Sequence, residues 1–229
     1  MLMTPKESSR RDFLKKLAIG GGGVVVLSKY HFLFGNEATN GILKAIVVDF
    51  DKCTGCRTCE TVCSAFHHPV EINGEILNGL GNPKLGNIQV YHYNPDVDIP
   101  SVCANCPDTP CVNACPVNAD PNANIKPIYR DEVTQAIRTN HDVCLGCGSC
   151  ADACETERTG IIKMNPITQH PEHICDLCGG DPQCVKNCPY GALSFREVDI
   201  NRTYFGLSPE EIAEELFERY YSGEEVING

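Results

Sequence analysis

The chain has no tryptophan, and aromatic residues make up only 7% of its 229 residues. Large apolar side chains are therefore scarce, and a core built from them alone would be small for this length. The 20 glycines and 15 prolines predict that much of the chain is loop. We expect bound cofactors to supply part of the stability, because groups that bind only the folded state favour that state by mass action.

Basic residues are few outside the N-terminus. The formal net charge is −11 at pH 7, yet residues 1–30 carry six Lys or Arg against Glu7 and Asp12. The remaining chain is strongly acidic. This argues against nucleic acid as a partner, because phosphates need a basic surface.

The N-terminus carries the features of an export signal. Arg10 and Arg11 precede Phe13 and the uncharged stretch 17–27, a pattern typical of a signal peptide. It resembles the twin-arginine signal, so we expect residues 1–35 to direct the protein to the periplasm or the periplasmic face of the membrane. The uncharged stretch of about 11 residues is shorter than the roughly 20 that span a bilayer. An amphipathic helix is the alternative, and whether the signal is cleaved stays open.

The 16 cysteines form four quartets with none left over. In every quartet two residues separate the first two cysteines, and three separate the last two. We call the first and fourth quartets outer, and the second and third inner. The quartets are Cys53, Cys56, Cys59, Cys63; Cys103, Cys106, Cys111, Cys115; Cys144, Cys147, Cys150, Cys154; and Cys175, Cys178, Cys184, Cys188.

These spacings are typical of [4Fe–4S] ligation. Three closely spaced thiolates wrap one cubane, and in two-cluster ferredoxins the fourth cysteine binds the neighbouring cluster. The sequence therefore predicts four [4Fe–4S] clusters, in pairs of quartets that exchange their last ligand. Pro116 and Pro189 follow the last cysteine as in bacterial ferredoxins, whereas Ser64 and Glu155 occupy that place in the other two quartets.

Three other uses of the cysteines were weighed. Structural zinc sites combine two separated C-x2-C pairs and do not need a further cysteine at a fixed spacing. Disulfides are common in exported chains, but cysteines two residues apart in one loop rarely bridge each other. A [3Fe–4S] centre is typical where one ligand is replaced, and here none is missing.

The segments around the quartets predict an α+β fold with loop-rich inserts. Short apolar, β-branched stretches are typical of strands in small antiparallel hairpins, and residues 62–66 are expected to be a short helix. Together they predict two ferredoxin-like modules within residues 43–199, with the insert between Cys63 and Cys103 as exposed loop. The predicted strands cover residues 43–49, 88–93, 136–140, 161–164 and 192–198.

Residues 200–229 form a C-terminal tail with one predicted helix. Ser208 and Glu211 match a capping box, Pro209 suits the first helical position, and apolar residues repeat on one face to Tyr221. The expected helix covers about residues 209–221. It either closes over the protein's own core or clasps a partner subunit.

The quartet layout, with the second quartet followed by Pro116, resembles the iron–sulfur subunits of molybdenum or tungsten pterin enzymes, such as dimethyl-sulfoxide and polysulfide reductases. The resemblance covers about residues 43–197. It implies that outer quartets pair with each other and inner quartets with each other. The implied ligand sets are Cys53, Cys56, Cys59, Cys188; Cys175, Cys178, Cys184, Cys63; Cys103, Cys106, Cys111, Cys154; and Cys144, Cys147, Cys150, Cys115.

A shorter match covers residues 63–68, 82–84 and 88–90. It is similar to the ferredoxin-type subunits associated with tungsten aldehyde oxidoreductases. Within it, His67 and His68 either tune a cluster and relay protons, or are surface and hydrogen-bonding residues. The second interpretation is favoured because cysteine already supplies every ligand.

These features predict a non-catalytic electron-transfer subunit with no catalytic residues. Its partner would be a large Mo/W pterin catalytic subunit, with a membrane anchor or a further redox protein as additional candidates. One alternative is a free-standing polyferredoxin that shuttles between partners through its acidic surface. Another is a structural protein whose metals only hold the fold.

Overall fold

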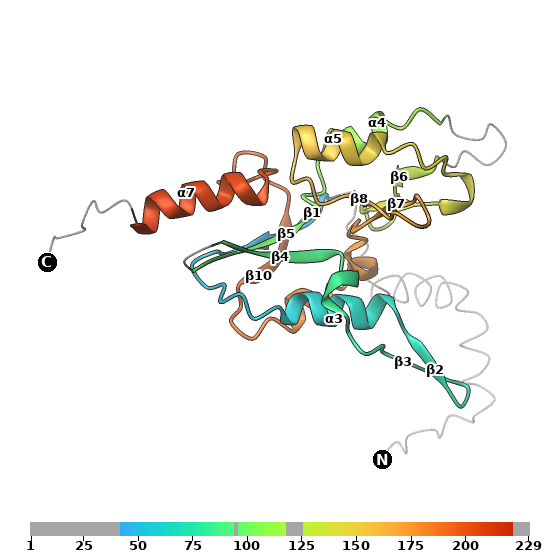
Figure 1. The fold of residues 1–229 in the computed structure, drawn as a ribbon, viewed down its shortest axis with the longest axis horizontal. Coiled ribbons are helices and arrows are strands. Elements are labelled where there is room, and N and C mark those ends of the chain that lie inside the picture. Colours follow the sequence, from blue (N-terminus) through green and yellow to red (C-terminus); the bar gives the residue numbers. More distant parts are fainter. Residues whose placement is uncertain (1–41, 94–95, 118–125, 222–229) are drawn as a thin grey trace, which may run out of the picture. The chain divides into compact units, whose positions relative to one another are not determined.

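Two strands from opposite ends of the cysteine-containing region pair with each other (Figure 1). The computed structural model describes residues 42–93, 96–117 and 126–221, all within one compact unit, Thr39–Gly229. β1 (Lys44–Val48) lies antiparallel to β10 (Leu193–Glu197). Both strands were predicted, but as parts of local hairpins. Their actual pairing joins the segment before the first quartet to the segment after the last.

The other strands also form two-stranded antiparallel pairs. Four of these strands lie between Cys63 and Cys103. The strand at residues 88–93 was predicted, but the prediction of loop was wrong for the other three. Asn73 and Gly74 have φ of 55° and 80°, the backbone that a tight hairpin turn needs. The pairs are β2 (Val70–Ile72) with β3 (Glu75–Leu77), β4 (Ile88–Tyr93) with β5 (Val97–Val102), β6 (Ile128–Arg130) with β7 (Ile137–Thr139), and β8 (Lys163–Met164) with β9 (Pro171–Glu172).

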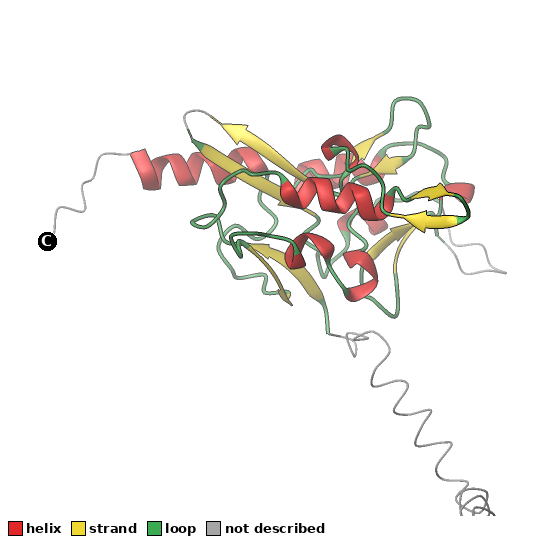
Figure 2. Ribbon diagram, turned by 90° about the horizontal axis from the view of Figure 1, so that it is seen from below, coloured by secondary structure: helices red, strands yellow, loops and turns green. Residues whose placement is uncertain are grey.

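Each quartet contributes one helix, which begins just before its third cysteine. Helices are red in Figure 2. The sequence placed the first of these helices too late, at residues 62–66. The helix of the first quartet packs against that of the fourth, and the second against the third. The helices are α3 (Thr58–His67), α4 (Pro110–Asn113), α5 (Ser149–Glu157) and α6 (Gln183–Lys186), with 3-10 turns η1 (Pro83–Leu85), η2 (His141–Val143) and η3 (Leu177–Gly180).

Buried apolar residues form two clusters that include cysteines. The outer core takes its cysteines from the outer quartets and its aliphatic side chains mainly from β1, β4, β5 and β10. The inner core takes them from the inner quartets, with Ile128 and Ile137 from β6 and β7. Cys103 packs against both cores. Cysteines thus fill positions that large apolar side chains take in an ordinary core.

Helix α7 (Pro209–Tyr221) lies against strand β5. Its first turn has the reciprocal bonds of a capping box, because Glu211 N donates to Ser208 Oγ (3.2 Å) and Ser208 N donates to Glu211 Oε2 (2.7 Å). Ile212 and Leu216 are buried against Val97 and Ile99 of β5. Of the two roles considered for this helix, it has the first, closing over the protein's own core.

Two predicted segments fall outside the described residues. They are the export signal, residues 1–35, and the last part of the tail, residues 222–229. Among the residues that the structure does describe, no helix is both long enough and apolar enough to cross a membrane.

Candidate metal centres

The loop between the first two cysteines of each quartet has the same backbone turn. The residue before the second cysteine has a positive φ in every quartet, which turns successive N–H groups toward one side and forms an anion-binding nest. The four residues are Gly55 (64°), Asn105 (51°), Gly146 (65°) and Leu177 (57°).

Glycine is needed at the first of these turns for a second reason. A Cβ on Gly55 would lie 2.1 Å from Asp98 Oδ2, so any side chain would collide with that carboxylate. Leu177 adopts the same backbone without this freedom, at a cost of about 1–2 kcal/mol. Its side chain is 1% exposed within the outer core, and this burial offsets the strain.

The third cysteine of every quartet is the second residue of a helix, and the fourth follows four residues later. Residues four apart lie on one helix face, about one turn or 5.4 Å along the axis. In α3 and α5 both cysteines are helical, whereas Cys115 and Cys188 lie just beyond the short helices α4 and α6. This offset lets the two cysteines of one helix serve two neighbouring sites.

Four groups of cysteines result, and each takes its members from two quartets. We name each group by its lowest-numbered member. They are the Cys53 group (Cys53, Cys56, Cys59, Cys188), the Cys63 group (Cys63, Cys175, Cys178, Cys184), the Cys103 group (Cys103, Cys106, Cys111, Cys154) and the Cys115 group (Cys115, Cys144, Cys147, Cys150).

The Cys53 and Cys115 groups each line a hollow. The four cysteines of the Cys53 group face one hollow together with Val90 and Leu193, and those of the Cys115 group face another with Ile128 and Met164. Burial raises the pKa of Cys59 to about 12 and that of Cys150 to about 11. An apolar wall therefore disfavours bare thiolates in both hollows, and a bound cation would have to supply the missing counter-charge.

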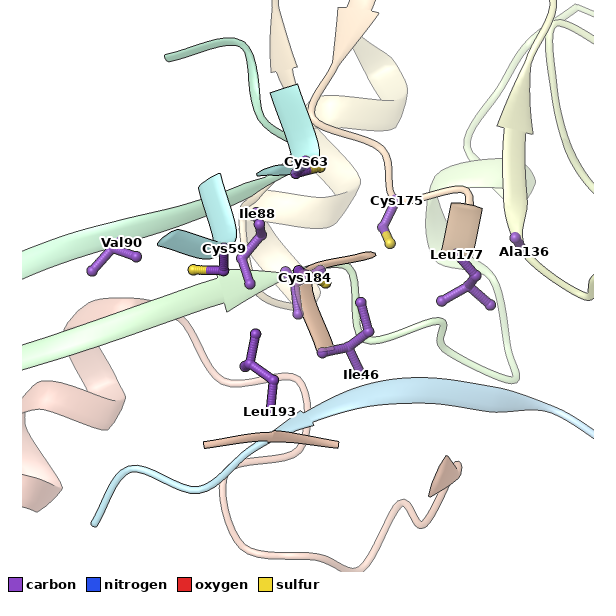
Figure 3. Packing of buried hydrophobic residues seen from close by; sticks show 11 residues of the cluster. Ile46, Cys59, Cys63, Ile88, Val90, Ala136, Cys175, Leu177, Cys184 and Leu193 are labelled. Atoms are coloured by element: carbon purple, nitrogen blue, oxygen red, sulfur yellow. The ribbon is translucent and has the colours of Figure 1, made fainter. Parts of the chain in front are cut away.

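The Cys63 group lies in the outer core. Burial raises the pKa of Cys184, and the nearby thiols of Cys63, Cys178 and Cys59 raise it further. In Figure 3 the sulfurs of Cys63 and Cys184 point to one side, whereas the Cys59 sulfur points to the other. Cys59 and Cys63 of the same helix thus face different groups.

The Cys103 group is enclosed as well. Burial raises the pKa of Cys111 to about 12, and among the neighbouring thiols Cys154 adds most to this effect. Burial likewise raises the pKa of Cys103, which lies near Cys111, Cys106 and Cys154. The last cysteine of the third quartet is therefore beside the first three of the second.

Electrostatic effects between neighbouring groups place them in one linear order. The thiol of Cys59 in the Cys53 group raises the pKa of Cys184 in the Cys63 group. In the same way Cys103 raises the pKa of Cys175, and Cys150 of the Cys115 group raises that of Cys111. The two exposed cysteines, Cys56 and Cys147, belong to the two terminal groups, and all 16 thiols are free of disulfides.

A buried carboxylate supports the Cys53 group. Glu60 is fully buried beside Cys59. It accepts hydrogen bonds from Arg57 Nε (2.7 Å) and from Val90 N (2.7 Å), which ties α3 to β4. Glu60 was not predicted from the sequence, because its pairing depends on a strand 30 residues further along the chain.

His67 and His68 have different surroundings. His67 Nδ1 lies 2.8 Å from Cys63 O, its Nε2 lies 2.9 Å from Asp176 Oδ1, and its pKa is raised to about 11 by hydrogen bonds to Asp176 and Cys63. His68 is exposed. His67 therefore links the first and fourth quartets through hydrogen bonds, in agreement with the favoured interpretation. Asp176, which it bonds, was not identified from sequence.

The residues present fit iron–sulfur clusters. Each group offers four thiols with at least one nest-forming turn beside it, and the Cys53 and Cys115 groups each line a hollow. Electron-transfer centres need such enclosure together with a route to the surface, which Cys56 and Cys147 provide. Fold and sites together define a ferredoxin-like protein with several metal centres.

Comparison with known proteins agrees with this class. Residues 95–155 match a 4Fe-4S dicluster domain and residues 44–65 a 4Fe-4S binding domain. The "Aliphatic sulfonate oxidoreductase, polyferredoxin-like subunit" of Pyrococcus furiosus is 38% identical over 143 residues, which cover 62% of this chain and 70% of that protein. The chain belongs to this polyferredoxin-like family of iron–sulfur electron-transfer subunits.

Two relatives in Escherichia coli extend the match. "Putative electron transport protein YsaA" is 30% identical over 67% of this chain and 90% of that protein. "Protein NrfC" is 27% identical over 83% of this chain and 81% of that protein. A solved structure of the "Active site complex BamBC of Benzoyl Coenzyme A reductase" is 26% identical with a TM-score of 0.35, covering 79% of this chain and 91% of that one, too low a score for its arrangement to be carried over.

Proposed function

We propose that the protein relays single electrons through four [4Fe–4S] clusters, to or from a molybdenum or tungsten pterin catalytic subunit. The observation that carries the proposal is the linear order of four cysteine groups with an exposed cysteine at each end. Each cluster, when bound, would take up and give off one electron. The chain's own part is to hold the clusters in line and keep water from the middle two.

The proposed ligands are the four cysteine groups. Each group combines three cysteines of one quartet with the last cysteine of another, which is the exchange seen in two-cluster ferredoxins. The two cores, one for the outer quartets and one for the inner, support a division into two ferredoxin-like modules. The proposal pairs the outer quartets, residues 53–63 and 175–188, in one module and the inner quartets, residues 103–115 and 144–154, in the other.

The catalytic partner is inferred from chemistry and resemblance. No catalytic residue was predicted from the sequence, so we propose that this protein supplies electrons to chemistry on another subunit. The Pyrococcus furiosus relative is described as a subunit of an oxidoreductase, which favours a permanent catalytic partner. Export through the N-terminal signal would place this assembly at the periplasmic side of the membrane.

A free-standing polyferredoxin remains the second candidate, because the body of the chain is acidic and acidic ferredoxins dock on basic patches. Purification of the native protein at high salt separates the two. A subunit keeps its large partner, which then carries molybdenum or tungsten, whereas a shuttle elutes alone.

The cluster content is tested on the isolated chain. We expect roughly 16 iron and 16 sulfide per chain, four of each per cubane, and EPR signals that appear on reduction with dithionite. Zinc in place of iron, or metal without redox activity, would contradict the electron-transfer role and favour a structural one.

A further inference from the structure

Two arginines lie beside the Cys103 group, and the proposed function gives them no role. Arg130 is half-buried at the end of β6. Its Nη1 donates to Asn105 Oδ1 (2.7 Å) and Gln135 O (2.5 Å), and its Nη2 donates to Cys106 O (2.5 Å). The guanidinium is thereby fixed directly behind the loop that carries Cys103 and Cys106.

Within the part of the chain that the structure describes, Arg130 has no carboxylate partner. Its acceptors there are two backbone carbonyls and one amide oxygen, all neutral, and none of the ion pairs among residues 42–93, 96–117 and 126–221 includes it. Burial lowers its pKa, whereas the thiols of Cys103, Cys106 and Cys111 act in the opposite direction. A guanidinium stays protonated in proteins, so a positive charge lies near Cys103, Cys106 and Cys111.

Arg158 also lies beside the Cys103 group. It follows helix α5, and its guanidinium favours the thiolate of Cys106. Its Nη2 pairs with Asp108, whose side chain is 56% exposed, while its Nε is buried without a hydrogen-bond partner among the described residues. Solvent screens the exposed carboxylate, so part of the positive charge of Arg158 remains directed at the cysteines.

The Cys53 group has the opposite surroundings. The carboxylate of Asp98 lies against Gly55 in its first loop and raises the pKa of Cys53, after the larger effect of burial. Glu60 lies beside Cys59. Arg57, the basic residue of this loop, is paired with Glu60, and the carboxylate of Asp98 lies 3.0 Å from Nδ1 of the exposed His92. The charged side chains nearest the cysteines are therefore carboxylates in the Cys53 group and guanidinium groups in the Cys103 group.

We propose that Arg130 and Arg158 are positioning residues that raise the reduction potential of the cluster bound by the Cys103 group above that of the Cys53 group. The inference rests on the proposed function. Reduction by one electron from a neighbouring cluster makes the cluster and its four thiolates one unit more negative, without a proton. Nearby cations stabilise this reduced form, and nearby carboxylates oppose it.

The test is a redox titration of the loaded full chain with dithionite, followed by EPR. Arg130→Met removes the charge, and Arg130→Lys keeps it. We expect Arg130→Met to change the reduced-to-oxidised ratio of one cluster about tenfold at a fixed potential, a downward shift of about 59 mV for a one-electron couple. Arg130→Lys keeps the positive charge, so its potential should stay close to that of the wild-type protein. A purely structural role of Arg130 does not predict this difference between the two variants.

Two further variants test the same inference if Arg130→Met does not bind its clusters. Arg158→Gln should lower the same potential, whereas Asp98→Asn should raise a different one. Arg196→Gln removes an exposed arginine on β10 and should leave all four potentials unchanged.

Each outcome is informative. Unchanged potentials in fully loaded Arg130→Met and Arg158→Gln, or equal shifts in Arg130→Met and Arg130→Lys, would overturn the inference and leave the electron-transfer role intact. A wild-type chain without redox-active iron would overturn the proposed function itself, and the inference with it.

Discussion

The half of the molecule around the outer quartets and the half around the inner quartets use the same backbone units. They differ in the sequence separation of the strands that pair in each half. Both have a left-handed turn before the second cysteine and a helix at the third. In the outer half β1 pairs with β10, and the two strands are almost 150 residues apart in the chain. In the inner half β6 and β7 form a local hairpin. The comparison teaches that local spacing specifies the sites, and long-range pairing decides which sites become neighbours.

Substitution of the exchanged cysteines is expected to have the largest effect on the clusters of the two halves. Cys188→Ser should remove or convert the cluster of the Cys53 group, because Cys188 lines that hollow, while leaving the Cys63 group loaded. Cys115→Ser should do the same to the group with Cys144, Cys147 and Cys150. Iron analysis should show a loss of up to about four iron per chain, with EPR spectra that identify the lost signal.

The two serine variants serve as controls for each other. Loss of the signal that belongs to Cys175, Cys178 and Cys184 in Cys188→Ser would mean that each quartet keeps its own fourth cysteine. That result would overturn the exchange of ligands in the outer half, and the electron-transfer role would stand.

A smaller effect, on stability, is expected at the residue that follows the second cysteine in the first and third quartets. Arg57 and Gly148 both have a positive φ, of 60° and 84°, but only Arg57 bonds a buried carboxylate. Arg57→Ala should destabilise the loaded protein by about 1–3 kcal/mol, because Glu60 loses a partner. Gly148→Ala should cost about 1–2 kcal/mol from backbone strain alone, since the nearest atom to a new Cβ is 3.9 Å away.

Thermal unfolding, followed by circular dichroism and cluster absorbance, measures both changes. Lys52→Ala breaks an exposed pair with Asp49 and should change stability by less than about 1 kcal/mol. Equal midpoints for Arg57→Ala and Lys52→Ala would show that the Arg57–Glu60 pair adds nothing to the outer half.

The smallest effect concerns helix α7, which packs on β5 and pairs with Asp51 near the first quartet. Ser208→Ala removes one capping bond and should cost about 1 kcal/mol, or roughly 2–4 °C in the melting midpoint. Hydrogen exchange should increase in residues 209–221 and leave β6 and β7 unchanged. Faster exchange in β6 or β7 would show that the two halves unfold together.

Some of this structure could be read from the sequence, because its causes are local. The quartet spacings place cysteines on turns and helix starts, and the Ser208–Glu211 capping box marks the beginning of α7. Asn73 and Gly74 are a hairpin signal of the same kind, and we interpreted them only as loop. The strand from residue 88 to 93 was predicted with the bounds of β4.

Other features depend on contacts between distant segments. No local pattern indicates that Lys44 lies opposite Glu197, or that Arg130 reaches Asn105 and Cys106. Glu60 has the sequence surroundings of an ordinary exposed helical residue, yet a bond to Val90 N accompanies its full burial. These residues carry charge into the sites, so the electrostatics of the clusters follow from tertiary structure.

The pairing of β1 with β10 also bears on the order of assembly. A chain emerging from the ribosome has every proposed ligand of the Cys103 and Cys115 groups once Cys154 has been made. The Cys63 group remains incomplete until Cys184 has been made, and the Cys53 group until Cys188 has been made. Strand β1 can pair only after β10, which follows both cysteines in the chain. Because chains begin to fold from the N-terminal side during synthesis, the inner clusters are expected to be inserted first, and the first strand of the fold is among the last to find its partner.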